Sequence, residues 1–162
     1  MEAWRGLLAP RTTRRRTQGV PVPYESLDKP LYSIAATATG GRSGHTRSAD
    51  GVVDLPLGKP NPSNPVANPE TLFAAGYAAC YNGALALVAQ REGVDASAAE
   101  TTADVTLGET ATGFGLAVAL TTTIPGVDEE TAQRLADLAH EFCPYSKATR
   151  GNIDVTVVGK PA

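Results

Sequence analysis

Apolar and polar residues alternate along the first third of the chain, and this pattern predicts β-strands. Between Leu31 and Thr39 every second residue is apolar or aromatic, which is typical of a half-buried strand: these residues are Tyr32, Ile34, Ala36 and Ala38. Asp50-Gly51 is a strong signal for a two-residue hairpin, and a second apolar stretch follows at 52–57. We therefore expect three elements of an antiparallel meander.

An uncharged segment in the middle of the chain predicts a long helix from about residue 69 to residue 91. Asn68 is a good N-cap, Pro69 suits the first helical position, and the carboxylate of Glu70 favours the positive end of the helix dipole. Residues 72–89 include no charged side chain, and Ala, Gly, Leu and Tyr occur on every face. Because a helix that is apolar all round is a buried helix, we expect a central element that ends before Gly93.

Two further strands, a second helix and a last strand follow. Residues 101–107 and 115–123 have the alternation of strands. Asp128 is a candidate N-cap for a helix whose apolar residues fall at i, i+3, i+4 and i+7, namely Leu135, Leu138, Ala139 and Phe142. Pro144 disfavours helical geometry at Cys143, so this helix should end near that cysteine. With a final strand at 153–157, the element order predicts an α+β fold of antiparallel sheets and a central buried helix.

The length and the distribution of charge indicate one domain that follows a basic extension. A chain of 162 residues suits one ordinary domain. Residues 1–30 carry six Lys or Arg and three acidic residues, and their net charge of +3 leaves −6 on residues 31–162. We expect 1–30 to be a flexible extension and 31–162 to be the folded domain. The run Arg14–Arg16 also suits a basic arm or a targeting segment, but it lacks the apolar stretch of a twin-arginine signal.

Composition argues against several classes of function. The acidic body argues against nucleic acid as the main partner, and no apolar run approaches the roughly 20 residues that span a bilayer. We expect a cytoplasmic protein with no membrane partner. Aromatic residues make up only 6% of the chain, so the core must consist of small aliphatic side chains, and a dimer interface would be a natural supplement.

The two cysteines are the candidate reactive groups. Cys80 and Cys143 lie 63 positions apart, which excludes a local CxxC motif, and His45 and His140 supply a zinc site poorly. The cysteines either pack as small apolar residues or act as a redox pair. Cys143 is expected at a helix end, where the backbone can move, and this suits a thiol that must travel to close a disulfide. Both interpretations stay open at this point.

A reactive Cys80 needs a positive group from another segment, because the thiolate is the nucleophile and the predicted helix has no Lys or Arg before Arg91. Arg42, in the glycine-rich turn 40–44, is the best-placed candidate. Glu70 precedes Cys80 by ten residues, about 15 Å along a helix, so we do not expect it to contact the thiol, although a carboxylate at a helix start can hold an arginine by a bidentate pair. The alternatives are a solvated Arg42, a Glu70 that only stabilises the helix dipole, and an inert buried Cys80.

Three segments resemble, in the family's own order, the signatures of the organic hydroperoxide resistance (Ohr) branch of the OsmC/Ohr family. The segments are 36–44, 68–80 and 143–152, and the resemblance covers about residues 31–158. It implies a peroxidatic Cys80, a resolving Cys143, an Arg42 that activates the thiolate and orients the peroxide, and a Glu70 that holds Arg42. It also implies an α+β intertwined homodimer with two active sites at the subunit interface.

The activity that the resemblance implies is the reduction of alkyl, aryl and fatty-acid hydroperoxides to alcohols, as a protection against oxidative stress. The route would be a Cys80 sulfenic acid and then a Cys80–Cys143 disulfide, reopened by an external dithiol that is typically a lipoylated protein. No metal, flavin or nucleotide cofactor is expected. Thr71 and Lys147 depart from the family pattern, and neither holds a chemical role. The alternatives are an OsmC-branch peroxidase of different peroxide preference and a non-catalytic small-molecule binding dimer.

Three residues of the predicted helix are candidate substrate contacts. Phe73, Tyr77 and Leu87 lie 7 positions before, 3 before and 7 after Cys80, so at 100° per residue they point within about 60° of it. Apolar side chains beside a thiolate would favour a peroxide with a carbon tail. We therefore expect faster oxidation by aryl or long-chain hydroperoxides than by hydrogen peroxide. The alternative is that these residues serve only the core.

Overall fold

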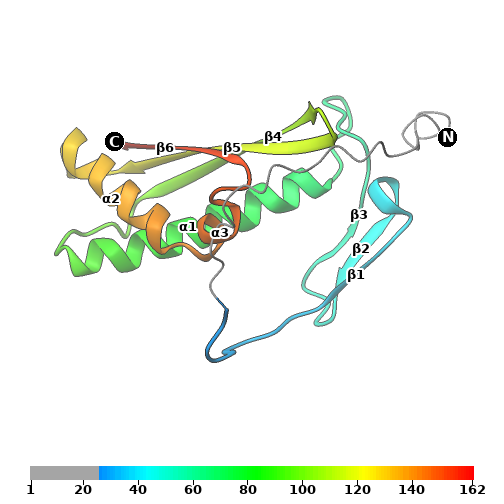
Figure 1. Cartoon of the computed structure of the whole chain (residues 1–162), viewed down its shortest axis with the longest axis horizontal. Helices are drawn as coiled ribbons and strands as arrows, with labels where there is room; N and C mark the ends of the chain where they lie inside the picture. The colour runs from blue at the N-terminus through cyan, green and yellow to red at the C-terminus, as the bar shows by residue number, and fades with distance from the viewer. Residues whose placement is uncertain (1–25) are drawn as a thin grey trace, which may run out of the picture. The chain divides into compact units, whose positions relative to one another are not determined.

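The computed structural model describes residues 26–162, and Tyr32–Ala162 form one compact unit of α+β architecture. Residues 1–25, which include the basic run Arg14–Arg16, lie outside the described residues. The unit contains two three-stranded sheets, a long helix between them in the sequence, and two more helices before the last strand (Figure 1). The predicted order of strands, helix, strands, helix and strand is confirmed, apart from one additional short helix before the last strand.

The first sheet is the predicted antiparallel meander. Its strands are β1 (Ala36–Thr39), β2 (His45–Ser48) and β3 (Asp54–Pro56), in the order β1-β2-β3. The predicted Asp50-Gly51 turn lies between β2 and β3, and Gly51 has the positive φ of 73° that glycine tolerates. In the observed register of β2 and β3, Thr46 is paired with Leu55. A slip by one residue would turn every side chain of a strand to the other face of the sheet.

The first strand is shorter and more exposed than predicted. Only Ala36–Thr39 pair with β2, and all four of these residues are exposed, as are Leu31, Tyr32 and Ile34 before them. The expectation of a half-buried strand from Leu31 to Thr39 is therefore wrong for the single chain. The physical reason is that β1, β2 and β3 pack mainly on one another, so that within residues 26–162 no second layer covers the apolar positions of β1.

The second sheet supports the helices. Strands β4 (Glu100–Thr110) and β5 (Gly113–Ile124) form a long antiparallel hairpin, and β6 (Asp154–Pro161) pairs in parallel with the other side of β5. Two helices pack on this sheet and against each other: α1 (Pro69–Arg91) lies against β4 and α2 (Glu129–Phe142) lies against β6. The parallel pairing of β6 corrects the expectation of antiparallel sheets for this strand, because strand alternation does not report direction.

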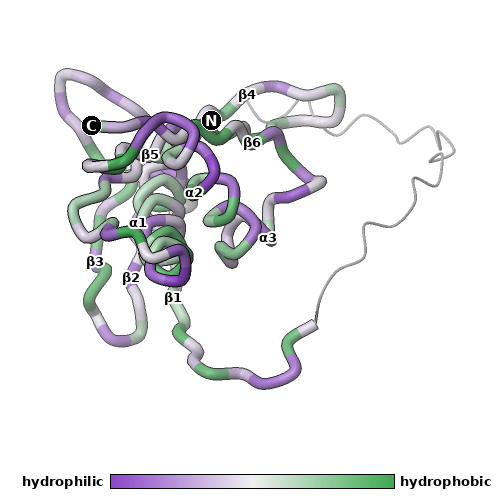
Figure 2. The backbone as a smooth tube through the Cα atoms, turned by 90° about the vertical axis from the view of Figure 1, so that its left-hand side faces the viewer, coloured by the Kyte–Doolittle hydropathy of each residue, from purple (hydrophilic) through white to green (hydrophobic). Residues whose placement is uncertain are grey.

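Helix α1 has the predicted bounds, but only one of its faces is buried. The side chain of Asn68 accepts a hydrogen bond of 2.8 Å from the Thr71 backbone N–H, as expected of an N-cap. Its buried face holds Tyr77, Tyr81, Ala84, Leu85, Val88 and Ala89. The opposite side is exposed, with Leu87 at 48%, so the expectation of a helix buried all round is wrong for one chain. In Figure 2 most of α1 is green or white, whereas purple residues recur along α2.

The length and composition of α1 also correct the expectation that no apolar run is long enough to span a bilayer. The helix has 23 residues, and an 18-residue window within it has a mean hydropathy of 1.5, which would suffice for a membrane helix by those two criteria. Core helices meet the same criteria, and the buried face of α1 packs on β4 and α2 as a core helix does. The apolar character of α1 is therefore explained on one face by the core of this unit.

Helix α2 ends where Pro144 predicted, and a short third helix follows that was not predicted. The Asp128 side chain accepts a hydrogen bond of 2.7 Å from the Thr131 backbone N–H at the start of α2. Cys143 follows the last helical residue with an extended ψ of 127°, and α3 (Pro144–Thr149) begins at once. Pro144 ends one helix and occupies the first position of the next, where its missing N–H costs nothing.

Candidate active site

The two cysteines face each other between the helices. Cys80, in the middle of α1, and Cys143, at the junction of α2 and α3, are free thiols with their Sγ atoms 3.5 Å apart. Cys143 is fully buried and Cys80 is half-buried. A disulfide needs an S–S distance of about 2.05 Å, so small movements of the two side chains would suffice to form one. The arrangement can therefore support dithiol–disulfide chemistry.

Local groups influence the Cys80 thiol in opposite directions. Burial raises the pKa of Cys80, the backbone N–H of Tyr145 lowers it by donating a hydrogen bond, and the neighbouring Cys143 raises it. The net effect within one chain is a raised pKa. Arg42 is not among these causes, so the expected effect of its charge on Cys80 stays a prediction.

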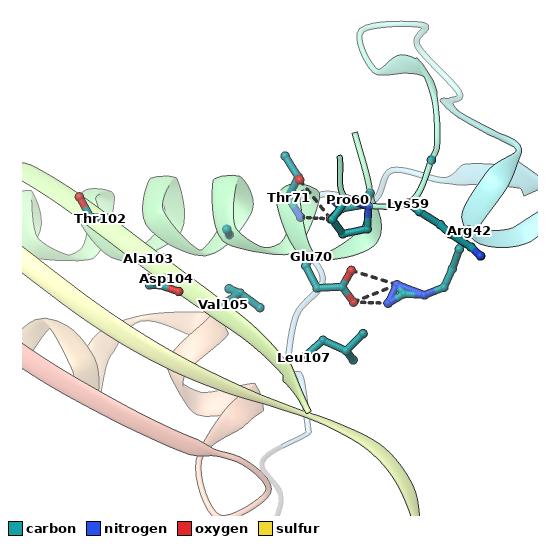
Figure 3. Close-up of a pocket in the computed structure, with 13 residues that line it drawn as sticks. Arg42, Lys59, Pro60, Glu70, Thr71, Thr102, Ala103, Asp104, Val105 and Leu107 are labelled. Carbon is teal, nitrogen blue, oxygen red and sulfur yellow. Dashed lines mark hydrogen bonds and ion pairs between the residues drawn. The ribbon is translucent and has the colours of Figure 1, made fainter. Parts of the chain in front are cut away.

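Arg42 and Glu70 form the bidentate pair that the sequence predicts (Figure 3). Nη1 of Arg42 donates to the two carboxylate oxygens of Glu70 at 3.0 and 2.9 Å, and Nη2 donates to Oε1. The Glu70 side chain is only 17% exposed, whereas that of Arg42 is 40% exposed. The carboxylate at the start of α1 therefore holds one side of the guanidinium and leaves part of it open to a ligand.

A glycine turn presents Arg42 to the start of α1. The short 3-10 helix η1 (Gly41–Ser43) follows Gly40, whose φ of 70° is in the left-handed region. A Cβ atom on Gly44 would lie 1.8 Å from the backbone oxygen of Thr39, so the return of the chain to β2 requires glycine there. The turn predicted from the flanking glycines is confirmed.

The Arg42–Glu70 pair and the cysteine pair lie at different places along α1. Glu70 is in its first turn and Cys80 is ten residues further on, a rise of about 15 Å. Within residues 26–162, the side-chain hydrogen bonds of Arg42 go to Glu70. One chain thus brings the cation to its carboxylate partner and brings the two sulfurs together, but it keeps the two pairs apart.

A pocket of about 750 Å³ opens beside the Arg42–Glu70 pair (Figure 3). Its walls include apolar residues of the loop before α1, of α1 and of β4, namely Pro60, Ala74, Val105 and Leu107. Lys59 and Asp104 add a charge of each sign. The contribution of β4 was not predicted. The apolar alternation at 105 and 107 was a visible signal, but it does not say which wall of which cavity a strand forms.

The three predicted substrate contacts lie elsewhere and do not line this pocket. Phe73 packs edge-on against Tyr77 with ring centroids 5.8 Å apart and stacks on Tyr145 at 6.2 Å. Tyr77 is fully buried, and Leu87 is largely exposed on α1. The alternative that these residues serve the core fits Tyr77, while a substrate role for Phe73, Tyr77 or Leu87 stays a prediction.

The two histidines lie in surroundings of their own and do not form a metal site with the cysteines. His45 lies on β2, and its Nε2 is 2.8 Å from a carboxylate oxygen of Asp54 on β3. His140, in the last turn of α2, has a buried Nδ1 to which residues 26–162 supply no hydrogen-bond partner, and burial lowers its pKa. Among residues 26–162, no three His, Cys, Asp or Glu side chains are grouped so that they could hold a metal ion.

Comparison with known proteins identifies the family. Residues 62–158 match the model of the OsmC-like protein family. The organic hydroperoxide resistance protein OhrB of Bacillus subtilis is 46% identical over 129 residues, which cover 77% of this chain and 95% of that protein. The organic hydroperoxide resistance protein of Xanthomonas axonopodis pv. citri is 46% identical over 138 residues, 82% of this chain and 96% of that protein.

Solved structures agree in fold. The organic hydroperoxide resistance protein from Elizabethkingia anophelis superposes with a TM-score of 0.77 at 46% identity, over 83% of this chain and 99% of that one. OhrB of Bacillus subtilis superposes with a TM-score of 0.74 at 44% identity, over 82% of this chain and all of that one. The chain therefore belongs to the OsmC/Ohr family, in its organic hydroperoxide resistance branch, and has that family's α+β fold.

Proposed function

We propose that this protein confers resistance to organic hydroperoxides as a thiol peroxidase in which Cys80 is oxidised and Cys143 resolves it. The observation that carries the proposal is the pair of free thiols with sulfurs 3.5 Å apart, one half-buried and one fully buried. Two relatives at 46% identity are named for organic hydroperoxide resistance, which supports the class of substrate.

The reaction takes two steps at sulfur. The Cys80 thiolate attacks one oxygen of ROOH, the O–O bond breaks, and the alcohol ROH leaves as Cys80 becomes a sulfenic acid. The Cys143 sulfur then attacks the Cys80 sulfur and expels water, which leaves a Cys80–Cys143 disulfide. The half-buried Cys80 meets the peroxide, whereas the buried Cys143 is shielded from it. No cofactor is required for either step.

The pocket beside Arg42 suits the carbon tail of the substrate. Its apolar walls, which include Ala74, Val105 and Leu107, would bury methylene groups, each of which contributes up to about 0.8 kcal/mol. The exposed side of the Arg42 guanidinium would donate hydrogen bonds to the peroxide oxygens. Hydrogen peroxide has no tail to fill the apolar part, so it should bind less well.

We further propose that the active unit is a homodimer in which the Arg42–Glu70 pair of one subunit serves Cys80 of the other. Within one chain, about 15 Å of α1 separates Glu70 from Cys80. A second copy of α1, packed antiparallel on the exposed face of the first, would bring the two pairs together. The exposed apolar residues before β1, such as Tyr32 and Ile34, would also be covered by such a partner.

The disulfide must be reopened by an external dithiol, for which we propose a lipoylated protein in the cytoplasm. The dithiol attacks one sulfur of the disulfide, forms a mixed disulfide and is itself oxidised as it leaves both cysteines reduced. Cys80 is the more exposed of the two cysteines and is therefore the expected point of attack. The proposal includes neither a nucleic acid nor a membrane partner.

Stopped-flow kinetics test the proposed function directly. Pre-reduced protein is mixed with cumene hydroperoxide, a fatty-acid hydroperoxide or hydrogen peroxide, and the second-order rate constant of Cys80 oxidation is measured for each. We expect the organic oxidants to react at least roughly tenfold faster, which corresponds to about 1.4 kcal/mol. Equal constants would leave only a generic thiol peroxidase. If no oxidant reacts faster with the protein than with free cysteine, the result would favour the alternative of a non-catalytic binding protein.

A further inference from the structure

A buried group of three hydroxyls attaches the short helix α3 to α1. The Tyr77 hydroxyl donates a hydrogen bond of 2.9 Å to Oγ of Ser146 and lies 3.1 Å from Oγ1 of Thr149. All three residues are buried. Since Thr149 also donates to the backbone oxygen of Tyr145 at 3.0 Å, the group joins the interior of α3 to one side chain of α1.

The positions of these residues relate the attachment to the two sulfurs. Tyr77 precedes Cys80 by three residues, about one turn of α1, and Ser146 follows Cys143 by three residues in α3. The Tyr77–Ser146 hydrogen bond therefore crosses from the turn beside Cys80 to the turn after Cys143. Within residues 26–162, the side-chain hydrogen bonds that join α1 to α3 are those of Tyr77 with Ser146 and Thr149 and the one that the Tyr145 backbone N–H donates to Cys80 itself.

The packing of Tyr145 also attaches α3 to α1, in addition to the hydrogen bond of Tyr77. Its ring stacks on Phe73, and it lies so close to α1 that a Cβ atom on Gly76 would be 3.2 Å from the Tyr145 hydroxyl oxygen. Stacking and close packing hold α3 near α1, but they are less directional than a hydrogen bond. The directional bond of the Tyr77 hydroxyl restricts that motion, because a hydrogen bond weakens steeply when its geometry is lost.

We propose that Tyr77 is a positioning residue for the second step of the proposed reaction: its hydroxyl holds α3, and with it Cys143, against Cys80. The inference rests on the proposed function. A Cys80 sulfenic acid has two fates. Cys143 can attack its sulfur with loss of water, or a second ROOH can oxidise it to sulfinic acid with release of a second ROH. A Cys143 that stays near 3.5 Å wins this competition, and a Cys143 that moves with a loosened α3 does so less often.

Tyr77→Phe tests this role, with Tyr81→Phe as its matched control. Both tyrosines are fully buried on α1 and donate through their hydroxyls, but Tyr81 bonds to the backbone oxygen of Ala136 in α2. Each reduced variant receives one or several equivalents of cumene hydroperoxide, and mass spectrometry gives the ratio of sulfinic acid to disulfide. This ratio reports the competition and does not depend on how fast Cys80 is first oxidised. We expect it to rise about tenfold in Tyr77→Phe and to change less than about twofold in Tyr81→Phe.

A second measurement needs no peroxide and separates the inference from the proposed function. In glutathione redox buffers, the disulfide exchanges with two glutathione thiols to give the dithiol and oxidised glutathione. The equilibrium constant reports how well the protein holds its two sulfurs together. We expect the disulfide of Tyr77→Phe to be about tenfold less favoured, or roughly 30 mV less reducing, and that of Tyr81→Phe to match the parent.

Ser146→Ala removes the other end of the same hydrogen bond and also serves if Tyr77→Phe does not fold. It should shift both measurements in the same direction, and the double variant should add little to either single one, because both remove one interaction. If Tyr77→Phe and Ser146→Ala leave the equilibrium unchanged, or if Tyr81→Phe shifts it equally, the positioning role is wrong even when the peroxidase is active. If the equilibrium shifts as expected but hydroperoxides do not oxidise Cys80, the positioning role stands and the proposed function fails.

Discussion

A mixture of two inactive variants should regain peroxidase activity if Arg42 acts on the partner's Cys80. Arg42→Ala lacks the cation and Cys80→Ser lacks the nucleophile, so each homodimer should be at least tenfold less active than the parent. In a mixed dimer, the intact Cys80 of one subunit faces the intact Arg42 of the other. The second site of that dimer contains both substitutions and is inactive.

The expected magnitude follows from the separation of the two pairs along α1. About 15 Å of α1 lies between Glu70 and Cys80 of one chain, so we expect the site to form across two subunits. A site made within one chain would gain nothing from mixing. For a two-fold symmetric dimer, equal amounts of the two variants give about half mixed dimers, each with one intact site, and hence about a quarter of the parent activity. Mixed dimers purified through two different affinity tags should have about half of the parent activity.

The control uses residues that one chain already brings together. Cys80 and Cys143 of the same chain are 3.5 Å apart, so a mixed dimer of Cys80→Ser and Cys143→Ser has no complete cysteine pair and should not turn over. The assay follows consumption of cumene hydroperoxide with excess dihydrolipoamide after unfolding and joint refolding. Failure of the first mixture to exceed its components, or recovery in the control mixture, would refute the arrangement across subunits.

Three other changes test the site and its surroundings. Cys80→Ser should abolish turnover, whereas Cys143→Ser should react once per subunit and then accumulate sulfinic acid, as mass spectrometry of the intact protein would show; sustained turnover by Cys80→Ser would disprove the assignment. Leu107→Ala should lower the rate constant for cumene hydroperoxide by about fivefold, or roughly 1 kcal/mol, and leave that for hydrogen peroxide unchanged; an equal loss for both would remove Leu107 from the substrate site. Burial and the charge of Arg150 lower the pKa of His140 below its ordinary value of 6.5, so the stability that its neutral form contributes is present above pH 6.5 and is lost as the pH falls below it. Urea unfolding at pH 8 and pH 5 should therefore show a larger loss for the parent than for His140→Gln, and equal losses would contradict the reasoning.

Features set by neighbouring residues could be predicted from the sequence. The start of α1 follows from Asn68, Pro69 and Glu70, and the turn that presents Arg42 follows from its glycines. The Arg42–Glu70 pair, whose members are 28 positions apart, was predicted from the resemblance to the family and not from neighbouring residues. At the start of α1 and at the turn, a few adjacent residues determine the geometry, and the rest of the fold does not have to be known.

Features that depend on distant parts of the chain could not be predicted in the same way. Nothing local shows that β6 pairs in parallel with β5, or that Val105 and Leu107 face the pocket near Arg42. The exposure of β1 and of one face of α1 could not be read from their apolar patterns, since a pattern shows that a face favours burial without showing what covers it. Helix α3 was missed because Pro144 was interpreted only as the end of α2.

The turn before β2 has a consequence for how substitutions at this site would be tolerated. Arg42 is the one residue of the turn to which a chemical role is assigned, yet its placement depends on glycines that have no functional group. A Cβ atom at Gly40 would lie 2.9 Å from the Cα atom of Gly44, and one at Gly44 would overlap the backbone of Thr39. In a saturation mutagenesis survey scored by survival under peroxide, Gly40 and Gly44 should therefore tolerate as few replacements as Arg42. Such a survey would identify residues that shape the loop as well as residues that carry out the chemistry.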